Sequence, residues 1–430
     1  MRPEQIERWL LERPVPEILP PDEGWVVPAY EGLSIANLPA TIAALLDSEL
    51  DGALPPLPEE IWRDWAPGLR RVVLVILDAL GYQMLHDSLA AGGGQPFRQL
   101  AQAGTMVPLT SIFPSTTAAA LVSLRTGRPP AEHGWLAYYM YLRELGVAAN
   151  AITLSPIRSR GGDILLEWGL DPESLVSVPS LAECLARNGI ATRAVLSVHF
   201  RNSGFTKMLY RGVAEIRGHL HASDLWGQLR HLLSETRGQR VVLTAYWGGL
   251  DALAHAYGPQ SDPWQAEFRT VSHLLKDELL DRLPAQDRDG TLLLLTADHG
   301  QITIPPERTV IATEHPELLQ HLLVPVVGEP RAAFLYPRPG HAGAVAHYLA
   351  QAYPGSFAIL HSAEALEAGL MGKPVSDEAL ARAGELLVLP RANYAIQQDR
   401  PKEPSVGRHG GLSAQEMLVP LIGTRLEAMS

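Results

Sequence analysis

The sequence is poor in cysteine, long apolar runs and basic residues, and each shortage excludes a class of protein. Cys184 is the single cysteine, so no disulfide can form within the chain. No stretch approaches the roughly 20 apolar residues that a membrane-spanning helix needs. The first residues carry charges and prolines where a signal peptide has an apolar segment. These features predict a cytoplasmic protein with no membrane partner.

The charge balance is acidic. The chain has 35 Lys and Arg residues against 47 Asp and Glu residues, which gives a formal net charge of −12. Such a chain repels nucleic-acid polymers and anionic membrane surfaces, so neither is expected as the main partner. A small phosphate ester is not excluded, because bound metal ions can neutralise its charge locally. A small-molecule phosphate ester or nucleotide therefore remains a possible substrate.

Apolar runs that alternate with helix-like segments predict the fold. The 430 residues are 46% hydrophobic, enough to bury a sizeable core. Runs typical of buried strands lie at 71–77, 105–112, 191–198, 240–247 and 290–297. Because helix-like segments separate them, the pattern predicts an α/β fold with a doubly wound, mostly parallel sheet and helices on both faces.

The same pattern suggests a division of the chain into four parts. Residues 1–70 form an N-terminal arm and a helix that packs on the core, and residues 71–304 form the catalytic core. Residues 305–400 alternate strand, helix, strand, helix and strand, which predicts a small inserted α/β module. Residues 401–430 return the chain to the core.

Several metal-ligand-type side chains stand just after apolar runs. They are Asp78, Asp251, His255, Asp298, His299 and His409. Taken singly, each is more simply a turn residue or a satisfied polar group. However, the ends of parallel strands meet along one edge of a sheet, so these residues can converge. Their mixture of carboxylate and imidazole suits Zn²⁺ or a similar divalent ion.

Thr117 is the candidate nucleophile. Residues 115–117 precede an Ala-rich stretch that ends at Thr126 and Gly127, which predicts a helix with hydroxyl residues at its start. The positive end of the helix dipole and a nearby cation would favour the alkoxide of such a hydroxyl. For Thr116 the simpler interpretation, an N-cap of this helix, is preferred.

These motifs resemble the alkaline phosphatase superfamily and, within it, the type I phosphodiesterase/nucleotide pyrophosphatase branch. The run from Phe113 to Gly134 matches the nucleophile segment of that branch without a gap, and the resemblance extends from Val72 to Ile422. It implies a phosphohydrolase with two divalent ions, Zn²⁺ or alternatively Mn²⁺, and a covalent phosphothreonine intermediate. By the same resemblance, one metal site comprises Asp78, Asp298, His299 and Thr117, and the other comprises Asp251, His255 and His409.

Two departures leave the substrate open. Tyr138 stands where the family has an asparagine that holds a phosphoryl oxygen, and Ala118 to Ala120 replace a bulkier polar segment. A phosphomonoesterase, a phosphomutase and a non-catalytic binder of phosphate ligands therefore remain as alternatives.

Aromatic and basic residues offer further candidates for substrate contact. Tyr138, Tyr139 and Tyr141 can stack on an aromatic group, although packing is the simpler role. Any of Arg143, Arg160 and Arg408 can contact phosphate oxygens, and the sequence does not choose among them.

Overall fold

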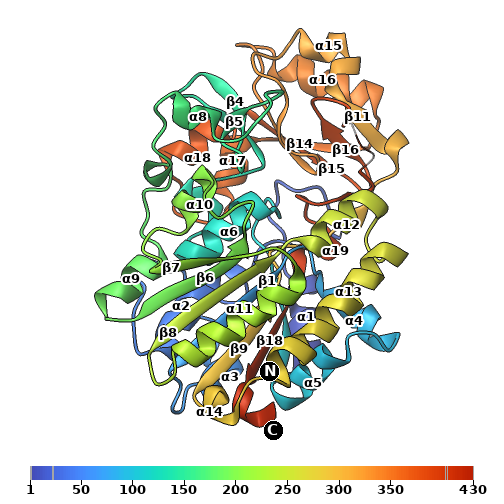
Figure 1. The fold of residues 1–430 in the computed structure, drawn as a ribbon. Helices are drawn as coiled ribbons and strands as arrows, with labels where there is room; N and C mark the ends of the chain where they lie inside the picture. The colour runs from blue at the N-terminus through green and yellow to red at the C-terminus, as the bar shows by residue number, and fades with distance from the viewer. Residues whose placement is uncertain (1, 22–23, 402, 404, 430) are drawn as a thin grey trace.

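Two seven-stranded sheets organise the protein (Figure 1). The computed structural model describes residues 2–21, 24–401, 403 and 405–429. The main sheet occupies the lower half of the view in Figure 1, and the second sheet lies above it. Both chain termini lie at the lower end, far from the second sheet.

The main sheet has the strand order β2-β18-β9-β1-β8-β6-β7. Its strands are β1 (Arg71–Leu77), β2 (Thr105–Thr110), β6 (Ala191–Ser197), β7 (Glu215–His219), β8 (Val241–Trp247), β9 (Thr291–Thr296) and β18 (Leu418–Arg425). Neighbouring strands pair in parallel except at β18, which is antiparallel to both β9 and β2. Strand β1 lies at the centre and is buried along its whole length, as the unbroken apolar run over 72–77 requires. The predicted α/β fold with a mostly parallel sheet is confirmed.

Helices connect and cover the strands. The α-helices are α1 (Pro3–Glu12), α2 (Leu38–Leu45), α3 (Glu59–Trp62), α4 (Tyr82–Ala90), α5 (Gln95–Ala103), α6 (Thr117–Thr126), α7 (Pro130–His133), α8 (Ile164–Glu167), α9 (Leu181–Arg187), α10 (Gly204–Leu209), α11 (Ala222–Glu235), α12 (Gly249–Tyr257), α13 (Asp262–Leu274), α14 (Ala285–Arg288), α15 (Pro316–Leu319), α16 (Ala342–Ala352), α17 (Ser362–Glu367), α18 (Asp377–Arg382) and α19 (Ala414–Met417). Within the described residues, none of these helices combines the length and the apolar character needed to cross a membrane. Cys184, on α9, is buried and unpaired, in keeping with a packing role.

The second sheet has the strand order β14-β15-β13-β12-β3-β4-β5, and every pairing in it is antiparallel. Its strands are β3 (Tyr139–Leu142), β4 (Val147–Asn150), β5 (Ser155–Pro156), β12 (Val327–Glu329), β13 (Ala332–Leu335), β14 (Phe357–His361) and β15 (Leu386–Pro390). The predicted order of elements within 305–400 appears as β13, α16, β14, α18 and β15.

This sheet crosses the predicted boundary of the inserted module. Gly328 of β12 pairs with Tyr139 of β3, so residues 139–156 extend a sheet that otherwise belongs to 305–400. The sequence did not indicate the pairing, because these strands are short and lie almost two hundred residues from their partner in the chain. The division into four parts stays a prediction.

The N-terminal segment supports two loops of the candidate site. The backbone N–H of Ala29 donates to Thr110 Oγ1 at 2.8 Å, and the Tyr30 hydroxyl accepts from the N–H of Phe113 at 3.2 Å. The N–H of Val26 donates to the carbonyl of Leu412 at 2.8 Å. The segment thus ties the approach to Thr117 to the loop that follows His409.

Candidate active site

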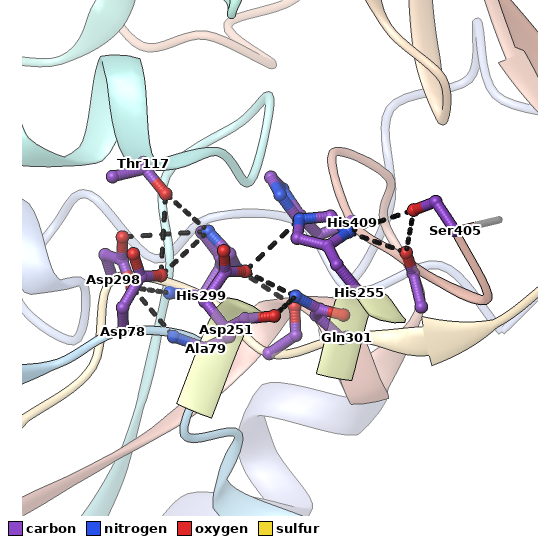
Figure 2. Close-up of polar contacts among 12 residues, drawn as sticks. Asp78, Ala79, Thr117, Asp251, His255, Asp298, His299, Gln301, Ser405 and His409 are labelled. Atoms are coloured by element: carbon purple, nitrogen blue, oxygen red, sulfur yellow. Dashed lines mark hydrogen bonds and ion pairs between the residues drawn. The ribbon is translucent and has the colours of Figure 1, made fainter. Parts of the chain in front are cut away.

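Three adjacent strands at the centre of the main sheet deliver three aspartates to one edge. Asp78 directly follows β1, and its backbone N–H donates to the carbonyl of Trp247 at the end of β8 at 3.0 Å. Asp298 follows β9, and Asp251 lies in the first turn of α12, which begins just after β8. Because β9, β1 and β8 are neighbours in the sheet, their carboxyl ends bring the three carboxylates together (Figure 2).

The carboxylates repel one another in a buried setting. Desolvation is the largest cause that raises the pKa of Asp78 well above its usual range, and the charges of Asp298 and Asp251 raise it further. Asp298 Oδ1 accepts hydrogen bonds from the N–H groups of Ala79 and His299, at 3.2 and 3.1 Å. Its other oxygen, Oδ2, is buried without a hydrogen-bond partner. Buried carboxylates in this arrangement stay ionised only when a cation lies beside them.

The three histidines are oriented as metal ligands. In each ring Nδ1 contacts a backbone carbonyl: His255 with Gly407 at 2.8 Å, His409 with Ser115 at 2.9 Å, and His299 with Gly300 at 3.1 Å. A carbonyl only accepts, so Nδ1 carries the proton and Nε2 keeps its lone pair. Burial is the main cause that lowers the pKa of His409 well below its usual range, which keeps this ring neutral. The residues present therefore fit divalent cations.

A buried ion pair fixes the loop that carries His409. Arg331 and Glu416 lie 3.1 Å apart and are almost fully buried. Glu416 Oε1 also accepts from the N–H of Gly411 at 2.9 Å. Arg331 donates in addition to the carbonyl of Tyr394, at 2.5 Å. The loop after His409 is thereby bound to the region of the second sheet.

Thr117 is the first residue of α6, as predicted, and Gly127 ends this helix in a left-handed conformation with φ of 67°. Thr117 Oγ1 lies 3.0 Å from His299 Nε2 and 3.5 Å from Asp78 Oδ1. The hydroxyl therefore sits between two candidate ligands at the positive end of a helix dipole. Ser111 Oγ donates to the carbonyl of Asp298 at 2.5 Å, which joins the segment before Thr117 to the end of β9.

Thr116 differs from its predicted role. It occupies the N-cap position of α6, but its side chain makes no capping hydrogen bond. The Thr116 hydroxyl bonds instead to the carboxyl group of Glu329 on β12. The sequence did not indicate this contact, since Glu329 lies more than two hundred residues away.

The candidate ligands form two overlapping groups. In one group the ligand atoms of Asp251, His255 and His409 lie within 4.8 Å of one another, and in the other those of Asp78, Asp251 and His299 do so. Asp251 thus reaches both groups, whereas the sequence assigned it to one. Asp298 adds a further oxygen 3.6 Å from His299 Nε2.

A cavity of about 580 Å³ opens over these residues. Tyr138 and Tyr139 line it and pack edge to face, with ring centroids 4.8 Å apart. Of the three candidate arginines only Arg408 lines this cavity, whereas Arg143 lines another and Arg160 is exposed. Tyr141 packs against Tyr336 instead.

Sequence reasoning missed three polar residues of the site. The Tyr246 hydroxyl donates to Asp78 Oδ2, and Gln301 Nε2 donates to Asp251 Oδ1, so each orients one aspartate. Glu329 is a buried carboxyl in the cavity wall. Tyr246 and Gln301 stand within a few residues of the predicted ligands, which was a usable signal. For Glu329 the signal was a carboxylate at the end of an otherwise apolar strand.

The match to a family sequence pattern identifies the chain as a phosphoric ester hydrolase of the alkaline phosphatase superfamily, and the fold agrees with this class. The chain belongs to the type I phosphodiesterase/nucleotide pyrophosphatase family, whose sequence pattern matches residues 72–412. A search of curated protein sequences gave no significant match.

Solved structures share the fold. Murine ectonucleotide pyrophosphatase/phosphodiesterase 5 superposes with a TM-score of 0.64 at 17% identity, over 82% of this chain and 87% of that chain. The human protein of the same name superposes with a TM-score of 0.62 at 15% identity, over 82% of this chain and 87% of that chain. Phosphonoacetate hydrolase from Sinorhizobium meliloti, in complex with phosphonoformate, gives 0.60 at 17% identity, over 83% and 93%. At these identities the similarity establishes the fold alone.

The overlap at Asp251 predicts unequal effects of ligand removal. We expect purified protein to hold about two divalent ions per chain. Replacing Asp251 by Ala should lower the occupancy of both sites, because its carboxylate reaches both groups. Replacing His255 by Ala should lower the occupancy of one site only and leave about one ion per chain. Elemental analysis of desalted protein measures the difference.

Asp277→Ala removes a partly exposed carboxylate that pairs with His273 and does not line the cavity. This variant serves as the control and should keep the wild-type metal content. No more than one ion in the wild type after supplementation with Zn²⁺ or Mn²⁺ would contradict the prediction. Equal losses in the Asp251 and His255 variants would contradict the shared role of Asp251.

Proposed function

We propose that the protein is a phosphodiesterase or nucleotide pyrophosphatase that acts through a covalent phosphothreonine intermediate on Thr117 at a two-metal site. The observation that carries the proposal is the position of the Thr117 hydroxyl, 3.0 Å from His299 Nε2 and beside Asp78 at the start of α6. Membership of the family supports the reaction class.

The chain itself supplies orientation for the nucleophile. Because His299 Nδ1 is bonded to the Gly300 carbonyl, Nε2 accepts, and the Thr117 hydroxyl donates to it. The Tyr246 hydroxyl occupies Asp78 Oδ2 and leaves Oδ1 turned toward Thr117. The α6 dipole favours negative charge on the Thr117 oxygen. Thr117 loses its hydroxyl proton to solvent and attacks phosphorus while the P–O bond to the leaving group breaks. Water then hydrolyses the threonyl phosphate diester, which releases a phosphate monoester and restores the Thr117 hydroxyl.

Two candidate ligand groups would hold divalent ions. Asp78, Asp298, His299 and Thr117 are the proposed ligands of one ion, and Asp251, His255 and His409 those of the other. Asp251 lies near enough to contribute to both. Bound divalent ions would stabilise the threonine alkoxide and neutralise charge on the phosphoryl and leaving oxygens. Imidazole and carboxylate ligands together favour Zn²⁺, with Mn²⁺ as the alternative.

The substrate is proposed to be a small phosphate ester or nucleotide. A cavity with two tyrosines in its wall suits a diester that has a second organic group. The structure of the murine relative has been solved, as an inactive variant, in complex with AMP, which supports a nucleotide-like ligand here.

A cytoplasmic location without nucleic-acid or membrane partners remains part of the proposal, on the grounds of sequence and charge. Phosphomonoesterase activity is the alternative that substrate comparison must exclude.

The nucleophile is tested by substitution. Thr117→Ala should lower kcat on a nitrophenyl diester by about a thousandfold or more, because no other hydroxyl occupies its position. Thr117→Ser should keep measurable turnover. Mass spectrometry of acid-quenched wild type should find the phosphoryl adduct on the peptide that contains Thr117.

Thr116→Ala is the matched control, since this neighbouring hydroxyl is bonded to Glu329. It should retain far more activity than Thr117→Ala. Loss of turnover in the Thr116 variant alone would show that the nucleophile is the other threonine.

The reaction class is tested by substrate preference. We expect the nitrophenyl ester of a nucleoside monophosphate to have a higher kcat/KM than nitrophenyl phosphate, because the cavity wall can contact the nucleoside. Steady-state kinetics on the metal-loaded enzyme measures both values. A clear preference for nitrophenyl phosphate would favour a phosphomonoesterase, and transfer of phosphate within one substrate would favour a phosphomutase.

A further inference from the structure

Glu329 is a buried carboxyl group in the wall of the cavity that contains the proposed nucleophile, and it has no role in the proposed reaction. It ends β12, is 4% exposed, and lines the same cavity as Thr117 and His409. Its Oε1 accepts a hydrogen bond from the backbone N–H of Tyr138 at 2.6 Å. Its carboxyl group also bonds to the Thr116 hydroxyl, one residue from the nucleophile.

The backbone next to His409 accommodates this carboxyl closely. Gly410 has φ of 115°, and a Cβ atom placed there would lie 2.5 Å from Glu329 Cβ. Only glycine tolerates both this conformation and this contact. Glu329 is therefore fitted between the start of α6, the segment at Tyr138 and the loop of His409, which surround the place where phosphorus must lie to be attacked.

The charge of Glu329 is only partly compensated. Burial raises its pKa to about 7, and the hydrogen bonds from Thr116 and Tyr138 act in the opposite direction. Arg408 and His299 act on it at longer range, but the Arg408 guanidinium donates to Gln397 Oε1, at 3.0 Å. Above neutral pH the cavity wall thus presents a carboxylate that has no guanidinium bonded to it.

A carboxylate at this position distinguishes phosphoryl groups by their charge. A phosphate monoester above neutral pH carries two negative charges, whereas a diester carries one. In a partly desolvated cavity, the Coulomb repulsion between a carboxylate and one additional negative charge within the same site is on the order of 1.4 kcal/mol or more, the free energy of a tenfold change in an equilibrium constant. This repulsion would disfavour the bound dianionic monoester relative to the monoanionic diester by about tenfold or more. The backbone N–H of Tyr138, which would suit a phosphoryl oxygen, is already occupied by Glu329.

We propose that Glu329 is a specificity-determining residue that disfavours dianionic phosphate monoesters and thereby selects monoanionic diesters. The inference rests on the proposed function, since it concerns the substrate class of the same site. It assigns the selection to charge, in addition to the contact that the tyrosine wall offers a second organic group.

The substitution Glu329→Gln tests the role of charge, because glutamine keeps the shape and an acceptor oxygen for the Tyr138 N–H. The substrates are bis(p-nitrophenyl) phosphate and p-nitrophenyl phosphate, with metal-loaded enzyme at about pH 8.5, where the monoester is dianionic and Glu329 is ionised. We expect the ratio of the diester kcat/KM to the monoester kcat/KM to fall about tenfold, mainly through a gain on the monoester. Glu329→Asp, which keeps the charge, should retain the preference for the diester.

Glu385→Gln is the matched control, because Glu385 is an exposed carboxylate beside β15 of the same sheet and outside the cavity. The ratio of diester to monoester kcat/KM in Glu385→Gln should equal that of the wild type. An unchanged ratio in Glu329→Gln, or an equal loss on both substrates, would overturn the inference and leave Glu329 with a structural role. If the wild type cleaves neither ester, the proposed function fails instead.

A measurement on the wild type keeps the inference testable if the Glu329 variants do not fold. p-Nitrophenyl methylphosphonate carries one negative charge and only a methyl group in place of a second ester group, so it separates charge from contact of a large organic group with the wall. Relative to its uncatalysed hydrolysis, we expect it to be accelerated more than p-nitrophenyl phosphate. An equal or greater acceleration of the dianionic monoester would contradict selection by charge.

Discussion

The repulsion among three converging carboxylates, two of them buried, is the constraint on which the site depends. Asp78, Asp251 and Asp298 converge because their strands are neighbours, and burial raises the cost of the charges on Asp78 and Asp298. Hydrogen bonds from Tyr246, Gln301 and the backbone satisfy some of the oxygens, yet Asp298 Oδ2 has no hydrogen-bond partner among the described residues. Divalent cations held by these ligands would relieve this repulsion and would also provide the electrostatic environment that phosphoryl transfer needs.

The rest of the chain holds the ligands around that centre. Three backbone carbonyls from separate loops fix the imidazoles with Nε2 available, and the buried pair of Arg331 and Glu416 fixes the loop that follows His409. The N-terminal segment joins the strands before Thr117 to the same loop. The second sheet forms part of the cavity wall through Glu329 and Tyr139, together with Tyr138 just before β3. Preorganisation of this kind keeps a nucleophile and its ligands in position before substrate binds.

Most of the fold and of the central site could be predicted from the sequence, because both depend on the ends of apolar strands. The runs before Asp78 and Asp298 define their own strands, and the start of α6 at Thr117 is visible in its composition. The position of Glu329 was not predictable, since its partners at Thr116 and Tyr138 come from distant segments. The pairing of β12 with β3 and the membership of Asp251 in both ligand groups were not predictable either, because both depend on packing in three dimensions.

The carboxylate and imidazole cluster is proposed to bind two cations beside Thr117. Anomalous diffraction from crystals grown with Mn²⁺ or Zn²⁺ would locate these cations. We expect two peaks in the cluster, one next to Thr117, Asp78, Asp298 and His299, and the other next to Asp251, His255 and His409. A single peak, or peaks that lie away from Thr117, would contradict it.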